Sequence, residues 1–88
     1  MIIFNSTDYD NPNKHYTKVK AEFNTDGRIM PLSMTYEDEE LEIDRVLDVR
    51  PAASLKSGGA GIRYTCMIEG VRTYLFLEET KWFFEPAV

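Results

Sequence analysis

The fold is decided by residues 61–86, which read GIRYTCMIEGVRTYLFLEETKWFFEP. Apolar and polar side chains alternate along this stretch with a period of two, which is typical of β-strands that bury one face. Two short turn signals, Glu69-Gly70 and Glu79-Thr80, divide it into three segments. Because a two-residue turn fixes which residues lie opposite each other, the stretch predicts a three-stranded antiparallel meander, the C-terminal meander.

The two turns also predict which side chains form the core. A turn at residues 69–70 places Tyr64 opposite Leu75, and a turn at residues 79–80 places Leu75 opposite Phe84. Paired residues of antiparallel strands share one face of the sheet, so one face becomes almost wholly apolar, with Thr73 opposite Cys66. The predicted core positions are Ile62, Tyr64, Cys66, Ile68, Leu75, Leu77, Trp82 and Phe84.

The preceding part of the chain repeats the pattern and predicts an N-terminal meander. With turns at residues 26–27 and 38–39, Val19 lies opposite Met34, and Met34 lies opposite Ile43. No window of the chain has the period of a convincing amphipathic helix. We therefore expect an all-β protein, a small antiparallel barrel or sandwich of five to six strands built from two three-stranded meanders.

Two residues interrupt the N-terminal meander. In the predicted register Arg45 lies at an inward position opposite Leu32, where an isolated guanidinium is costly to bury. Three explanations stay open: a β-bulge near Asp44 that turns Arg45 outward, a buried ion pair with an acid such as Asp48, or an anion-binding site. Pro31 cannot donate a backbone hydrogen bond, so we expect it at a sheet edge or a bulge.

Length and composition indicate one globular domain. The chain has 88 residues, of which 43% are hydrophobic and 12% aromatic, and this length allows a single core. We expect residues 17–88 to form a single β domain. Residues 1–16 are polar and rich in turn-forming residues, and they predict an N-terminal arm that can add an edge strand at residues 1–4.

The net charge of −5 comes from one acidic segment. Residues 37–48 contain seven acidic side chains and Arg45 as their one base. Duplex DNA binding without sequence preference needs several basic residues, so the overall charge argues against that function. The acids lack the spacing of a calcium-binding EF-hand loop, and we interpret them as solvated strand and turn residues.

Targeting and redox signals predict a cytoplasmic protein without a membrane partner. No stretch approaches the roughly 18 to 20 apolar residues that a membrane-spanning helix needs. Cys66 is the one cysteine of the chain, so it cannot form an intramolecular disulfide. Residues 57–61 (SGGAG) lack the Lys-Ser/Thr pair of a phosphate-binding loop, and we interpret them as a connection.

The face of the C-terminal meander opposite its core is not polar, although solvent is expected there. It carries aromatic, thioether and guanidinium groups beside each other, and such patches mark binding surfaces. The candidate binding residues are Arg63, Met67, Arg72, Tyr74, Phe76 and Phe83. They predict a noncatalytic protein-binding or accessory module, whose partner is another protein or a second copy of the chain.

Two other interpretations of this face stay open. The N-terminal arm can fold over the patch and complete the core. Alternatively, rings interleaved with arginines can stack with the bases and contact the phosphates of single-stranded nucleic acid.

Catalytic motifs are missing from the sequence. His15 is the one histidine, and no cysteine or second histidine stands near it to complete a metal site. No Ser or Cys has a motif spacing that joins it to a base and an acid. We therefore predict no catalytic residue, no metal and no cofactor, and keep a small-ligand enzyme using Arg45 or His15 beside an acid as an alternative.

Several blocks of the chain carry a family resemblance. They are residues 27–31 (GRIMP), 42–50 (EIDRVLDVR), 52–54 (AAS), 61–64 (GIRY) and 81–85 (KWFFE). These blocks resemble a group of small uncharacterised all-β proteins of Gram-positive, clostridia-like bacteria, and the resemblance implies no activity. More loosely, an Ile-x-Arg-Val strand followed by a closing Trp-Phe strand is similar to small β modules found near DNA-repair polymerases, which supports the nucleic-acid alternative.

Overall fold

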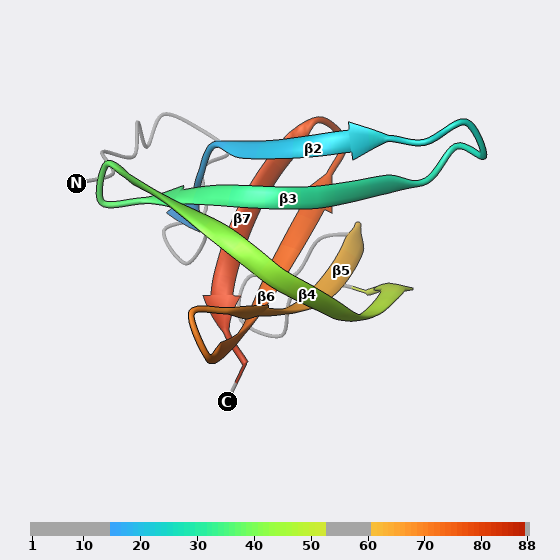
Figure 1. Ribbon diagram of the computed structural model, residues 1–88. Coiled ribbons are helices and arrows are strands. Elements are labelled where there is room, and N and C mark those ends of the chain that lie inside the picture. The colour runs from blue at the N-terminus through green and yellow to red at the C-terminus, as the bar shows by residue number, and fades with distance from the viewer. Residues whose placement is uncertain (1–14, 53–60, 88) are drawn as a thin grey trace.

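The computed structural model describes residues 15–52 and 61–87 (Figure 1). These residues form seven strands and no helix, which confirms the all-β prediction. The strands are β1 (His15–Tyr16), β2 (Val19–Phe23), β3 (Ile29–Tyr36), β4 (Glu39–Pro51), β5 (Ile62–Ile68), β6 (Val71–Glu78) and β7 (Lys81–Pro86). All neighbouring strands are antiparallel, in the order β1-β7-β6-β5-β4-β3-β2.

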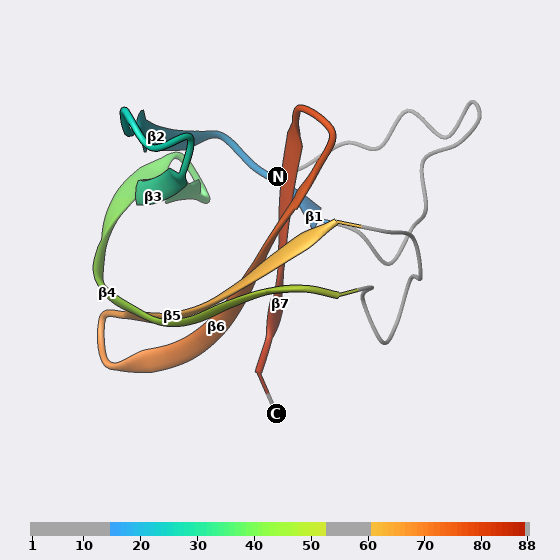
Figure 2. The ribbon, with the colours of Figure 1, turned by 90° about the vertical axis from the view of Figure 1, so that its right-hand side faces the viewer.

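The two predicted meanders belong to one curled sheet. Strand β4 has 13 residues, and it pairs with β3 through its first part and with β5 through its second part. Figure 2 shows the sheet bending along β4, so that the β2–β3 hairpin lies above β5 and β6. The sheet is therefore a half-barrel in which β4 is shared by both meanders.

The segment that runs from β1 into β2 bends and pairs with both edge regions of the sheet. Strand β1 pairs with β7, whereas β2 pairs with β3, and the two strands are separated by Thr17 and Lys18 alone. The Thr17 amide donates to the Trp82 carbonyl oxygen at 3.0 Å, and the Thr35 amide donates to the Lys18 carbonyl oxygen at 2.9 Å. The edge strand predicted at residues 1–4 lies outside the described residues.

The predicted registers of the C-terminal meander are confirmed. Glu69 and Gly70 have φ values of 51° and 78°, which is typical of a two-residue hairpin turn. Tyr64 lies opposite Leu75, and Leu75 lies opposite Phe84, as expected.

The turn predicted at residues 26–27 is wrong in detail. The Asn24 amide donates to the Arg28 carbonyl oxygen at 2.8 Å, and the Gly27 amide donates to the Asn24 carbonyl oxygen at 2.9 Å. The loop therefore contains three residues, and Gly27 has a φ of 89°, as is usual for three-residue hairpin loops.

A bulge in β3 compensates for this longer loop. Phe23 pairs with Ile29, one residue away from its predicted partner. The register then shifts because β3 contains an extra residue, Leu32. This shift restores the predicted pair of Val19 with Met34.

The turn predicted at residues 38–39 lies one residue earlier. Glu37 and Asp38 have φ values of 50° and 65°, so they are the two central turn residues. Met34 consequently lies opposite Leu41 rather than two residues further along β4.

Both predicted interruptions of the N-terminal meander are bulges. The β4–β5 register passes from Ile43 to Arg45 and skips Asp44, and Arg45 is exposed. The bulge explanation is thus confirmed, and the alternative of a buried Arg45 charge is wrong. Pro31 stands beside the extra residue Leu32, where a missing amide is tolerated.

The inner face of the half-barrel holds the main core. Its buried apolar residues are Met34, Tyr64, Cys66, Ile68, Leu75 and Leu77. The Tyr64 hydroxyl donates to the Ile29 carbonyl oxygen at 2.6 Å, which ties β5 to β3 across the curl. The Tyr64 ring also lies 5.4 Å from the Trp82 ring.

Candidate functional site

The candidate binding residues all lie on the outer face of the sheet, opposite the core. Cross-strand pairs place residues of neighbouring strands on the same face. Three rows cross this face: Arg45–Met67–Arg72, then Asp48–Thr65–Tyr74–Glu85, then Arg50–Arg63–Phe76–Phe83–Tyr16. The registers therefore bring together the six residues that the sequence singled out.

Two of these residues are not surface residues. Phe76 and Phe83 are each only 2% exposed, and their rings stack 4.8 Å apart at an interplanar angle of 4°. The Tyr16 ring packs edge-on against Phe83 at 6.0 Å. The expectation that both phenylalanines are exposed is wrong, because they form a second, smaller core on the outer face. Of the arm expected to cover them, residues 1–14 lie outside the described residues.

Six other outer-face residues form a partly exposed surface, which we call the basic strip, and Asp48, Thr65 and Glu85 lie between them. Its members are Arg45, Arg50, Arg63, Met67, Arg72 and Tyr74. Three of the arginines are exposed, and the other members are half-buried. The strip contains four of the five arginines in the chain, although the chain as a whole is acidic.

Local contacts hold the arginines in place at one end of the strip. The Arg50 Nε and Nη2 atoms donate to the Asp48 carboxylate at 2.7 and 3.2 Å, and this hydrogen bonding lowers the pKa of Asp48. The Arg63 guanidinium lies 4.6 Å from the centre of the Tyr74 ring, a favourable cation–π distance. These contacts offset the repulsion between Arg50 and Arg63, which lie opposite each other.

The other end of the strip presents two exposed cations around an apolar side chain. Arg45 lies opposite Met67, and Met67 lies opposite Arg72. Neighbouring strands are about 4.8 Å apart, so the two arginines start roughly 10 Å apart on the sheet. This spacing suits an acidic segment that places carboxylates on both sides of a small apolar contact.

Sequence reasoning missed Arg50 and its pairing with Asp48. Both lie in β4, and their place beside Arg63 depends on β4–β5 pairing with two bulges. No turn signal fixes this pairing, because the strands are joined by a long connection rather than by a hairpin. The sequence-level signal that was available is their spacing of two residues, which puts both on one face of a strand.

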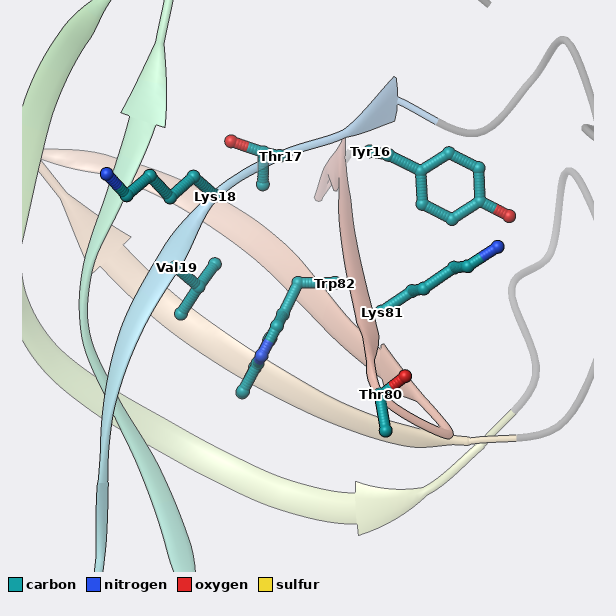
Figure 3. A pocket seen from close by; sticks show the side chains of 7 residues that line it. All are labelled: Tyr16, Thr17, Lys18, Val19, Thr80, Lys81 and Trp82. Carbon is teal, nitrogen blue, oxygen red and sulfur yellow. The ribbon is translucent and has the colours of Figure 1, made fainter. Parts of the chain in front are cut away.

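A separate pocket of about 520 Å³ lies where the chain passes from β1 to β2 (Figure 3). It is lined by Tyr16, Thr17, Lys18, Val19, Thr80, Lys81 and Trp82. Figure 3 shows Lys18 and Lys81 pointing to opposite sides of Trp82, so the two ammonium groups do not converge on one anion. The pocket was not expected from the sequence, because it depends on the bend at residues 17–18.

The side chains considered for catalysis do not form a reactive cluster. Cys66 is completely buried, and burial raises the pKa of its thiol to about 12, so it remains protonated and unreactive. His15 pairs with Phe84 through the backbone of β1. Within residues 15–52 and 61–87, no group of three or more His, Cys, Asp or Glu side chains is placed to hold a metal ion.

The acidic segment lies mainly on another part of β4. Glu40 accepts a hydrogen bond from the Ser33 hydroxyl at 2.8 Å and pairs with Lys20 at 3.2 Å. The hydrogen bond from Ser33, followed by that from Lys20, lowers the pKa of Glu40. Most acids of the segment therefore lie beside β3 or in the turn before β4, whereas both arginines of β4 lie beside β5, with Asp44 and Asp48 next to them.

Comparison with known proteins finds no family model, curated protein or solved structure that matches the chain. The resemblance to small clostridial β proteins therefore stays a prediction. The described part of the chain contains no helix that is long and apolar enough to cross a membrane.

Proposed function

We propose that the protein is a noncatalytic binding module that uses the basic strip to hold an acidic segment of a partner protein. One observation carries the proposal: four of the five arginines gather on one face of an acidic chain. Complementary charge steers partners and fixes their orientation. Met67 and Tyr74 add the thioether and aromatic contacts that are enriched at protein interfaces.

The geometry favours a protein partner over single-stranded nucleic acid. Stacking with bases needs exposed ring faces, but Phe76 and Phe83 are buried. The third ring of the predicted platform, Tyr74, already has the Arg63 guanidinium over its ring. The strip thus offers cations without a free stacking surface.

A titration followed by amide NMR tests the proposal. The probes are a glutamate-rich peptide and a mixed-sequence single-stranded DNA, each at low and high salt. We expect the peptide to shift the amides of the basic strip, and we expect this effect to decrease with salt. Arg72→Glu should weaken peptide binding by roughly tenfold or more.

The matched control is Arg28→Glu, which makes the same charge change at the one arginine outside the strip. We expect it to bind the peptide within about a factor of two of the wild type, apart from the long-range effect of net charge. Equal losses in both variants would contradict a localised site. Tighter binding of the DNA than of the peptide would replace the proposal with the nucleic-acid alternative.

A further inference from the structure

Strand β2 is an open edge of the sheet. It pairs with β3 on one side, and it is the last strand in the sheet order. Figure 2 shows no described strand on its far side. Exposed edges present unpaired backbone groups that can pair with another chain.

The hydrogen bonds at both ends of β2 show which residues face this edge. Asn24 and Lys18 bond to the neighbouring hairpin strand. Backbone groups of an antiparallel strand alternate in direction from one residue to the next, and the extra bulge residue belongs to β3. The backbone amides and carbonyls of Val19, Ala21 and Phe23 therefore point away from β3 and toward solvent.

The side chains of β2 are complementary to a second copy of the same strand. If two β2 strands pair antiparallel about Ala21, Lys20 lies opposite the partner subunit's Glu22. Val19 then lies opposite the partner subunit's Phe23. Charged residues, especially lysine, protect many edge strands from association, but β2 carries one charge of each sign, Lys20 and Glu22, which neutralise each other in this pairing.

Exposure supports the same pairing. Phe23 is 76% exposed, the largest value among the exposed large hydrophobic residues of the described chain. A neighbouring Val19 from a second copy would cover part of its ring. Lys20 pairs with Glu40 at 3.2 Å, so a second acid would complete a cluster of one cation between two carboxylates.

We propose that two copies of this chain associate through β2, in antiparallel pairing centred on Ala21. The two sheets then form one continuous sheet with a twofold axis at Ala21. Because a five-residue edge gives an interface at the small end of the known range, the dimer is weak and depends on protein concentration. The basic strip belongs to β4, β5 and β6 and stays accessible in this dimer.

Sedimentation velocity across about 10 μM to about 1 mM protein tests the dimer. We expect the wild type to shift from monomer toward dimer over this range. Glu22→Lys and Lys20→Glu should each place like charges opposite each other and remain monomeric. An equimolar mixture of these two variants should dimerise, because each mutant edge then faces the opposite charges.

Glu39→Lys is the matched control, because it makes the same charge change as Glu22→Lys at an exposed position outside β2. It should associate like the wild type, within about a factor of two. Phe23→Ser should weaken association at least severalfold while leaving the monomer folded, because this ring is largely exposed. A misfolded single variant would be recognised by its melting curve, and the double variant K20E/E22K then replaces it and should associate like the wild type.

Three results would overturn the dimer proposal. They are a wild type that stays monomeric at all concentrations, a Glu22→Lys variant that dimerises normally, and a variant mixture that fails to associate although both variants are folded. The experiment contains no peptide or other partner. Its failure would therefore leave the proposed function of the basic strip untouched.

Discussion

The two faces of β5 and β6 are built from alternating residues of the same strands, but they differ in how they are used. The inner face is apolar and buried over most of its length, with Tyr64, Cys66, Leu75 and Leu77 in the core, and it ends at Thr73 and the exposed Val71. The outer face changes along β6, from the buried Phe76, which stacks on Phe83 of β7, to the exposed Arg72.

This difference assigns fold stability mainly to the inner face and binding to the outer face. A face that is apolar and buried over most of its length serves to hold the fold together. A face that is buried at one end and charged at the other can anchor itself and still present groups to a partner. Four measurements test this distinction.

The largest effect should come from truncating neighbouring residues on opposite faces. Leu75 is 0% exposed and Phe76 is 2% exposed, so Leu75→Ala and Phe76→Ala should each lower the free energy of unfolding by about 2 to 5 kcal/mol. Urea denaturation measures both. A loss below about 1 kcal/mol for Phe76→Ala would show that the outer phenylalanine pair is not a core.

A smaller effect should distinguish two tyrosines. Tyr64→Phe leaves the partly buried Ile29 carbonyl oxygen without its hydrogen-bond donor and should cost about 1 to 3 kcal/mol of unfolding free energy. Tyr74→Phe on the outer face keeps the ring beneath Arg63 and should cost less than about 0.5 kcal/mol. Similar losses in thermal melts of the two variants would contradict the division between the faces.

The inner face should also give the protein an alkaline limit. Burial raises the pKa of the Cys66 thiol from its ordinary value of 9.0 to about 12. The unfolded chain therefore ionises first, so this contribution to stability is complete below pH 9 and is lost as the pH rises toward 12.

Cys66→Ala isolates that contribution. The variant should be less stable at neutral pH because it leaves a cavity. Its stability should fall less steeply above pH 9, by up to about 1.4 kcal/mol per pH unit. Equal slopes for variant and wild type, measured by urea denaturation at several pH values, would show that the thiol ionises equally easily in both states.

The smallest effect on stability should come from the exposed end of the outer face. Arg72 is exposed, so Arg72→Ala should change the unfolding free energy by no more than about 0.5 kcal/mol. The same variant should bind the glutamate-rich peptide more weakly than the wild type. A large loss of stability on thermal melting would make Arg72 a structural residue.

The sequence predicted the C-terminal meander better than the N-terminal one, because both of its turns have two residues and its strands pair without a bulge. Gly70 marks one of these turns, because glycine adopts a positive φ without strain. The β3–β4 turn uses Glu37 and Asp38, both at positive φ, and no glycine reveals its position. In the β2–β3 hairpin, the third loop residue and the extra Leu32 cancel each other, so Val19 was paired correctly despite a wrong turn.

The sequence predicted on which face of the sheet the candidate site lies, but not which of its side chains are buried. Alternation along β5 and β6 placed Arg63 and Phe76 on one side of the sheet, and the structure agrees. Burial of Phe76 depends on which residues cover the outer face, and period-two alternation gives no information about them. Arg50 joins Arg63 only through the bulged β4–β5 pairing, and single-strand patterns give no information about such long-range registers.

The bent segment that runs from β1 into β2 has a consequence for the order of folding during synthesis. Its first strand must wait for β7, which leaves the ribosome near the end of the described chain, whereas each hairpin can form soon after its own two strands emerge. Contacts between distant positions are slow to form because a long loop must close first. We therefore expect the half-barrel to remain open on the nascent chain, with β1 unpaired until β7 has left the ribosome.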